Sequence, residues 1–138
     1  MRQAQTVFVD SGAWIALALS RDPLHERARE QWDLLQRAGA KLHTSVPVAI
    51  ESFTFLERNA NRDVALAWKE SIYRPGTVKI LPCELVDLQQ SWDYFRRSDL
   101  HKLSAVDATS FAIMKRARIR IAYTFDHHFA AVGFRLVS

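Results

Sequence analysis

The chain has few of the residues that cross-link, break or flexibly join protein domains. Among its 138 residues there are one cysteine, Cys83, four glycines and four prolines. A single cysteine excludes an internal disulfide and a cysteine-based zinc site, which fits a reducing compartment. The scattered glycines and prolines leave no linker-like or repetitive stretch, and 49% hydrophobic residues are enough for one core. We therefore expect a single domain over residues 1–138.

The chain also lacks a long apolar run. Its most apolar stretch, residues 7–19, is interrupted by Asp10 and two small residues, whereas a membrane span needs about 18 or more apolar residues. A carboxylate in the middle of the stretch also argues against a secretory signal core. We expect a cytoplasmic protein that does not enter a membrane.

Positive charge is in excess, with a formal net charge of +4 at pH 7. A basic body around an acidic centre suits a polyanionic substrate, such as RNA, that is cut by a bound metal ion. Lysine and arginine that serve only solubility would give the same net charge. Charge alone leaves these two interpretations open.

Hydrophobic periodicity predicts strands that alternate with helices. The expected strands cover residues 6–9, 41–44, 77–81, 119–125 and 134–137. The expected helices cover residues 11–19, 25–37, 47–56, 64–71, 85–97, 104–116 and 126–131. This alternation favours an α/β domain with a mainly parallel central sheet.

Four carboxylates occupy places where such a sheet would bring them together. Asp10 and Asp126 follow predicted strands, Asp107 lies in a first helical turn, and Glu51 lies about one turn into its helix. Ligands of open parallel sheets bind beyond the carboxyl ends of the strands. A carboxylate at an apolar core is costly unless it is paired or bound to a metal, so we infer one shared site.

Each acid also has a structural explanation. Asp10 and Asp126 could be helix N-caps, Asp107 could complete a capping box with Ser104, and Glu51 could pair with Arg58. Capping does not explain why the acids concentrate at one predicted edge. Four adjacent carboxylates repel each other unless a cation neutralises them.

Oxygen ligands without a histidine or cysteine pattern favour Mg²⁺ or Mn²⁺ over zinc. Such an ion could activate a water for phosphodiester hydrolysis and stabilise the leaving oxygen. Ser11 and Thr124, beside the strand ends, could hydrogen-bond a ligand carboxylate, a phosphate or water.

Three segments together resemble the PIN-domain family, in particular the VapC-like toxins of toxin–antitoxin pairs. They are FVDSGAWIA at residues 8–16, LSAVDATSFAIM at residues 103–114, and YTFDHHF at residues 123–129 with Gly133-Phe134 after it. The helix with Glu51 adds a fourth, less distinctive match. The resemblance implies a three-layer α/β/α fold, a Mg²⁺- or Mn²⁺-dependent endoribonuclease, a homodimer, and inhibition by a small antitoxin.

The resemblance also implies roles for individual residues. Asp10, Glu51, Asp107 and Asp126 match the acidic quartet of the family, so they are the expected catalytic residues and metal ligands. Asp99 matches an additional acid found in part of the family and is expected to support the site, although an ordinary exposed acid would look the same.

Basic and aromatic residues complete the prediction. The run at residues 115–120 has four cations, but it closes a helix and should lie at the sheet edge opposite the acids, where helix-end electrostatics explains it. Large aromatics in the early helices, Trp14 and Trp68 among them, could be packed in the core or line a groove for an antitoxin helix or strand.

Three other functions are compatible with parts of the pattern. One is a stand-alone PIN ribonuclease that works without an antitoxin. Another is a non-catalytic Mg²⁺- or phosphoryl-binding module of receiver type, although the segment at residues 78–81 ends without the acid that such a domain needs. The third is a protein that binds RNA without cutting it.

Overall fold

The computed structural model describes residues 4–138 and contains one five-stranded sheet, in which every strand pairing is parallel. The strands are β1 (Thr6–Val9), β2 (Lys41–Ser45), β3 (Lys79–Leu81), β4 (Ile121–Tyr123) and β5 (Arg135–Leu136). The helices are α1 (Ser11–Ala18), α2 (His25–Arg37), α3 (Val46–Asn59), α4 (Arg62–Tyr73), α5 (Leu85–Ser91), the 3₁₀ helix η1 (Trp92–Arg96), α6 (Ala105–Ala117) and α7 (His128–Ala131). The predicted α/β class and parallel sheet are confirmed.

The strand order is β3-β2-β1-β4-β5, so the chain adds strands first on one side of β1, where β2 and β3 lie, and then on the other, where β4 and β5 lie. Val9 at the end of β1 is in register with Tyr123 at the end of β4. In parallel sheets the point where the order reverses leaves a crevice beyond the strand ends, which is the usual place for a ligand.

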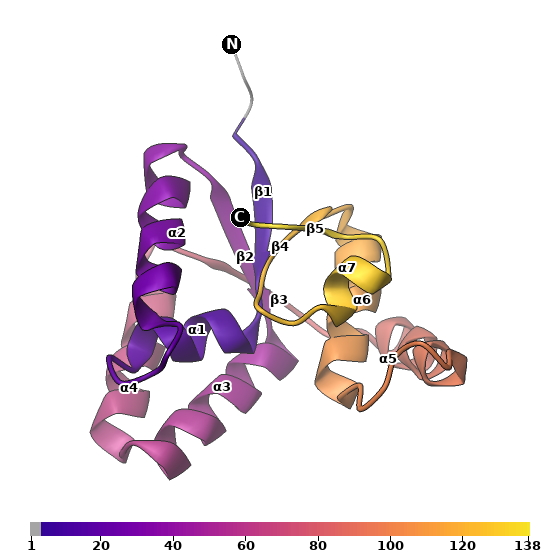
Figure 1. Ribbon diagram of the computed structural model, residues 1–138, viewed down its shortest axis with the longest axis horizontal. Helices are drawn as coiled ribbons and strands as arrows, with labels where there is room; N and C mark the ends of the chain where they lie inside the picture. Colours follow the sequence, from indigo (N-terminus) through magenta and orange to yellow (C-terminus); the bar gives the residue numbers. More distant parts are fainter. Residues whose placement is uncertain (1–3) are drawn as a thin grey trace.

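Helices cover both sides of this sheet, as Figure 1 shows with α2 on one side and α6 with α7 on the other. Burial explains the apolar strand sequences, because Val7, Phe8 and Val9 of β1 are all fully buried. On the other side of the sheet, Phe111 of α6 is buried and meets the ring of Phe129 edge-on at 4.9 Å between centroids. A packed core therefore holds β1 and α6 in place on the sheet.

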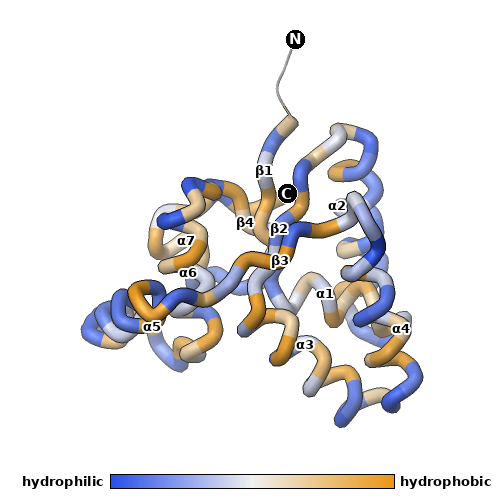
Figure 2. Tube along the Cα trace, turned by 180° about the vertical axis from the view of Figure 1, so that it is seen from behind, coloured by the Kyte–Doolittle hydropathy of each residue, from blue (hydrophilic) through white to orange (hydrophobic). Residues whose placement is uncertain are grey.

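Surface helices follow the expected amphipathic pattern. Figure 2 shows hydrophilic and hydrophobic residues mixed along α2, whose Ala28 and Leu35 are buried while Leu34 is exposed. Gly39 ends this helix with φ at +68°, a conformation that glycine adopts without strain. No helix within residues 4–138 combines the length and the apolar character that crossing a membrane requires.

The helix expected over residues 85–97 differs in the structure, because α5 ends at Ser91 and a 3₁₀ turn replaces its second half. The Ser91 hydroxyl donates to the Leu88 carbonyl at 2.5 Å, and such local bonds compete with the helical ladder. Tyr94 in the 3₁₀ turn packs on Phe111 at 5.0 Å between ring centroids. Tertiary packing thus decides where this helix breaks.

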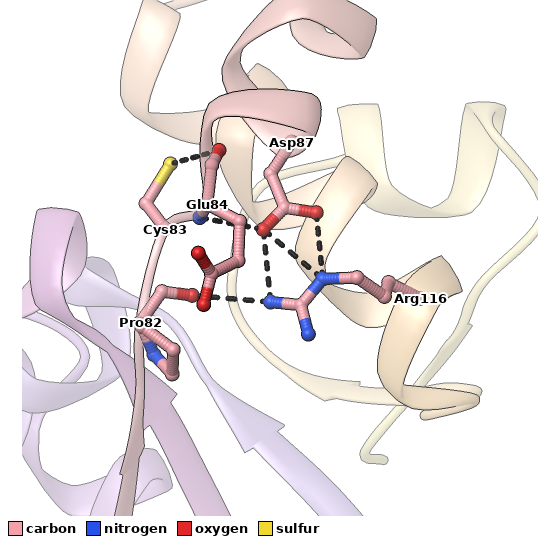
Figure 3. Close-up of polar contacts among 5 residues, drawn as sticks. All are labelled: Pro82, Cys83, Glu84, Asp87 and Arg116. Atoms are coloured by element: carbon pink, nitrogen blue, oxygen red, sulfur yellow. Dashed lines mark hydrogen bonds and ion pairs between the residues drawn. The ribbon is translucent and has the colours of Figure 1, made fainter.

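An ion pair between a buried aspartate and a partly exposed arginine fastens α5 to the end of α6, as Figure 3 shows. Asp87 is fully buried and accepts hydrogen bonds from Arg116 at 2.8 and 2.9 Å. The Asp87 carboxylate also accepts from the Glu84 backbone N–H at 2.8 Å, while Arg116 donates to the Pro82 carbonyl at 3.3 Å. These contacts tie the end of β3, the start of α5 and the last turn of α6 into one unit.

Candidate active site

Asp10 is placed by the end of β1, where its backbone N–H donates to the Tyr123 carbonyl at 3.0 Å. It occupies the N-cap position of α1, but its side chain makes no capping hydrogen bond. One carboxylate oxygen, Oδ2, accepts from Thr124 Oγ1 at 2.9 Å. The other, Oδ1, is buried without a hydrogen-bond partner. Asp10 therefore holds the N-cap position without capping α1 through its side chain, and one of its buried oxygens has no partner.

Asp126 is held by the loop that follows β4. Its backbone N–H donates to Thr124 Oγ1 at 3.0 Å, so the hydroxyl of Thr124 contacts two of the four acids. The Asp126 carboxylate accepts from the His128 backbone N–H at 2.9 Å and also contacts the His128 ring. Asp126 thus closes the turn before α7 while part of its carboxylate stays exposed to the cleft described below.

Asp107 lies in the first turn of α6 and is almost fully buried, with 8% of its surface exposed. The helix starts at a Ser104 cap, whose hydroxyl accepts from the Asp107 backbone N–H at 3.0 Å. The Asp107 carboxyl lies next to the carboxylate of Asp126. Ligand atoms of Asp107, Asp126 and His128 all lie within 4.8 Å of one another. This spacing is close enough for one ion to contact them.

Glu51 reaches the same place from α3. It accepts a short hydrogen bond of 2.5 Å from the hydroxyl of Ser11, 40 residues earlier in the chain. Within residues 4–138 no ion pair joins Glu51 to Arg58, so that alternative interpretation of Glu51 is wrong. The Ser11 hydroxyl instead directs the glutamate toward the start of α1.

One cleft of about 510 Å³ brings the four acids together. Its lining consists of Asp10, Ser11, Gly12, Glu51, Ser104, Asp107, Phe125, Asp126 and His127. Thr124 is buried at the end of β4 and supports this cleft through its two hydrogen bonds. The fold therefore assembles acids that are separated by more than a hundred residues in the sequence.

Asp99 lies outside the cleft. Its carboxylate is exposed and forms a two-point contact with Arg97, at 3.0 and 2.7 Å. Three polar neighbours of the site were not singled out from the sequence as site residues, namely Ser104, His127 and His128. The capping position of Ser104 and the two histidines directly after Asp126 are the signals that point to them.

Electrostatics sets the four acids apart from ordinary surface carboxylates. Burial, with the nearby charge of Asp10 as the next cause, raises the pKa of Asp107 to about 9. Burial also raises the pKa of Asp10 to about 6, against the hydrogen bond from Thr124. For Asp126 burial is outweighed by hydrogen bonds from Asp107 and His128, which lower its pKa. Mutual repulsion of this kind is relieved when a cation binds.

The donor set fits a hard divalent cation. Asp10 offers an unpartnered buried oxygen, and the carboxylates of Asp107 and Asp126 lie close to each other. Mg²⁺ and Mn²⁺ favour such oxygen ligands, and Mg²⁺ commonly uses one or two protein carboxylates together with waters and substrate phosphate. Asp10, Asp107, Asp126 and Glu51 are therefore the residues that could hold the ion.

A parallel sheet of this order with four acids beyond its strand ends defines the class of protein. The family model described as "PIN domain" matches residues 7–135. The chain belongs to the PIN-domain family, which confirms the resemblance seen in its sequence motifs.

Within this family, the chain is similar in sequence and in structure to one protein of Mycobacterium tuberculosis. The chain is 36% identical over 129 residues to the "23S rRNA-specific endonuclease VapC20" of Mycobacterium tuberculosis, covering 93% of this chain and 95% of that protein. The crystal structure of that VapC20, described as a sarcin–ricin loop cleaving toxin, superposes with a TM-score of 0.81 at 33% identity, with coverage of 93% and 95%.

More distant structures share the fold. The DNA-bound VapBC complex of Salmonella typhimurium gives a TM-score of 0.68 at 13% identity, with 96% of each chain covered. The FitAcB structure of Neisseria gonorrhoeae gives 0.67 at 16% identity, also with 96% of each chain covered.

Proposed function

We propose that this protein is a cytoplasmic, Mg²⁺- or Mn²⁺-dependent endoribonuclease and the toxin of a toxin–antitoxin module. The observation that carries the proposal is the convergence of Asp10, Glu51, Asp107 and Asp126 on one cleft, with a buried oxygen of Asp10 left without a partner. Identity of 36% to a ribosomal RNA endonuclease supports the same activity.

The four acids would hold the metal, which when bound supplies an activated water and stabilises charge on the leaving oxygen. The surrounding side chains keep those acids in place. Thr124 fixes Oδ2 of Asp10 and leaves Oδ1 without a protein partner. Ser11, the residue after Asp10, holds Glu51 through its hydroxyl. Groups that are fixed before the substrate arrives cost no reorganisation during the reaction.

The overall charge favours RNA as the substrate. The net charge of +4 rises to +8 when the four site acids are left out of the count. Cations on the rest of the surface attract a polyanion, while the acids and their metal act on one phosphodiester bond. The identity to VapC20 makes a 23S ribosomal RNA fragment with the sarcin–ricin loop the first substrate to test.

Cleavage assays with and without the divalent ion test this function. RNA should be cut in Mg²⁺ or Mn²⁺ and not in EDTA, and Asp10→Asn or Asp107→Asn should each lower the rate by at least about a hundredfold, as losses of key electrostatic groups do. Asp99→Asn is the matched control, because Asp99 lies outside the cleft. Cutting that persists in EDTA, or in both site variants, would sink the mechanism. Metal-independent RNA binding without cutting would instead identify a binding protein.

An apolar groove of about 580 Å³ is the proposed antitoxin site. It lies among α1, α2 and α4 and is lined by three tryptophans. The ring of Trp14 lies 5.9 Å from that of Trp32 and 6.0 Å from that of Trp68, between centroids. Trp14 and Trp68 are mostly buried, so they form the floor of the groove and also pack in the core. An amphipathic antitoxin segment would place its apolar side chains there.

A charge placed in this groove tests the antitoxin proposal. Ala67 lines the groove, whereas its neighbour Leu66 is exposed and does not. Ala67→Arg should abolish relief of toxicity by the small protein encoded next to the toxin, while Leu66→Arg should not. Toxicity on induction that no neighbouring protein relieves would favour a stand-alone ribonuclease.

We propose that the protein forms a homodimer through the apolar surface of α5 and η1. Leu85, Trp92 and Phe95 are about half exposed or more, at 70%, 52% and 47%, and the last two rings contact each other. Burial against a second copy would remove this apolar surface from water. Sedimentation should give a dimer at micromolar concentration that Trp92→Glu converts to a monomer. A monomeric parent protein would overturn this part of the proposal.

A further inference from the structure

A second cleft, which we call the basic cleft, lies at the edge of the sheet opposite the acids. It has a volume of about 590 Å³ and three cations in its lining: Lys115 of α6, Arg120 directly before β4, and Arg135 of β5. Its other lining residues are Ile121, Val132, Gly133 and Phe134. No carboxylate lines it, so the hollow is positively charged.

Arg120, directly before β4, and Arg135, the first residue of β5, lie close together in the backbone, where the N–H of Arg135 donates to the Arg120 carbonyl at 2.9 Å. Within residues 4–138 no ion pair links Arg120, Arg135 or Lys115 to a carboxylate. Three unpaired cations around one hollow are available to an anionic ligand.

The neighbouring residue Arg116 shows the contrast. Two nitrogens of its guanidinium donate to Asp87 (Figure 3), so its charge is paired with a carboxylate of the fold. Lys115 instead rests over the Tyr94 ring at 5.2 Å from the centroid. Helix-end electrostatics, the explanation expected from the sequence, accounts for Lys115. It does not account for Arg120 and Arg135, because neither residue belongs to a helix.

Helix α6 connects the two clefts. Asp107 lies in its first turn and Lys115 in its last, eight residues away, which at 1.5 Å per residue is about 12 Å along the axis. A phosphodiester bond held at the acids therefore cannot also contact the cations. Only a nucleic acid that continues along the protein, or folds back on itself, reaches both ends of the helix.

We propose that the basic cleft binds backbone phosphates of the RNA substrate away from the bond that is cut. This inference rests on the proposed ribonuclease function and specifies its substrate as RNA long enough to reach both ends of α6. Contacts between cations and phosphates position a nucleic acid and add affinity without reading its sequence. The cleft thus favours structured RNA over short fragments.

Salt-dependent binding to two RNAs tests the proposal. Asp107→Asn protein, which should bind RNA without cutting it, is titrated with a folded RNA hairpin and with a single-stranded tetranucleotide at several salt concentrations. In this background Arg120→Gln with Arg135→Gln removes two cations from the cleft. Arg62→Gln with Lys69→Gln is the matched control on α4, outside both clefts.

We expect the cleft variant to bind the hairpin about tenfold more weakly at low salt and to lower the slope of log affinity against log salt by about 1.5, because each phosphate contact contributes about 0.7 to 0.9. Tetranucleotide binding should stay unchanged, and the control should keep the parental slope. Arg120→Lys with Arg135→Lys keeps the charge and should restore hairpin binding, which separates lost contacts from misfolding.

Equal hairpin slopes for the cleft variant and the control would overturn the proposal. Unchanged RNA binding with weaker binding of polyglutamate would also overturn it and assign the cleft to an acidic protein. If the protein with Asp107 intact cuts both RNAs, and the cleft variant binds them as the control does, the ribonuclease function stands and only the basic-cleft proposal is rejected. A parent that neither binds nor cuts RNA rejects the ribonuclease function itself.

Discussion

Thr124 Oγ1 donates a hydrogen bond to Asp10 Oδ2 at 2.9 Å, joining two strand ends that are 114 residues apart in the chain. The same hydroxyl accepts the backbone N–H of Asp126 at 3.0 Å. One buried side chain therefore positions two of the four acids. It also leaves Oδ1 of Asp10 as the free oxygen of the site.

Thr124→Val removes this hydroxyl with little change in shape. We expect a loss of about 1–3 kcal/mol in the free energy of unfolding, because a buried carboxylate oxygen and a backbone N–H lose their partner. Cleavage should fall as well, since Asp10 is no longer fixed. Chemical denaturation and RNA cleavage measure the two effects, and Thr124→Ser should retain most of both. A stable and fully active valine variant would contradict the positioning role.

Asp107→Asn separates metal binding from folding. Burial and the charge of Asp10 raise the pKa of Asp107 to about 9, so at pH 7 the carboxyl is already neutral in metal-free protein. The neutral amide should therefore change the melting temperature in EDTA by only a few degrees. Mn²⁺ should raise the melting temperature of the parent and leave that of the variant unchanged. An equal Mn²⁺ effect on both would exclude Asp107 from the metal site.

Stability without metal should depend on pH in a direction that the site dictates. The folded protein keeps protons on Asp10 and Asp107 to about pH 6 and about pH 9, whereas the unfolded chain loses them near pH 4. A raised pKa in the folded state stabilises below the unfolded pKa, and this stability is lost as the pH rises through the folded pKa.

The free energy of unfolding in EDTA should therefore fall between pH 6 and pH 9, mainly through Asp107. Asp107→Asn should flatten this part of the profile. Denaturation at each pH provides the measurement. A parental profile that is flat over the same range would show that the Asp107 carboxyl is not neutral in the folded protein.

Asp87→Ala should be among the most destabilising substitutions outside the site. Asp87 is fully buried and accepts from Arg116 and from the Glu84 backbone N–H, and donors that lose such a partner cost about 1–3 kcal/mol. Asp99→Ala, which removes an exposed pair with Arg97, should cost less than about 1 kcal/mol. Urea denaturation compares the two variants. Equal costs would mean that burial of the Asp87 pair contributes little.

Much of the fold followed from sequence patterns. Alternating apolar segments predicted every strand and helix of the sheet layers, because burial on both faces of a parallel sheet leaves continuous apolar runs. The break at Ser91 was missed because it depends on a side-chain hydrogen bond and on the packing of Tyr94 against Phe111. The strand predicted over residues 119–125 begins too early, since Ile119 still closes α6 through its N–H to the Met114 carbonyl and β4 covers only Ile121–Tyr123.

For the candidate site, the sequence likewise predicted some features and missed others. Strand ends for Asp10 and Asp126, and helix starts for Asp107 and Glu51, suggested that the four acids share an edge, and the structure places them in one cleft. Their catalytic and metal-binding roles stay predictions. The partners that hold them, Ser11 for Glu51 and Thr124 for Asp10, depend on side-chain directions that sequence spacing does not specify.

By itself the sequence determined the family, the parallel sheet and the list of acids, because these depend on residue type and on local periodicity. Only the tertiary structure decided which oxygen of Asp10 stays free and which cations remain unpaired. Arg116 and Arg120 look alike in a basic run, yet one is bound to Asp87 and the other faces a cleft. Such differences arise from contacts between segments far apart in the chain, and only the packed fold sets those contacts.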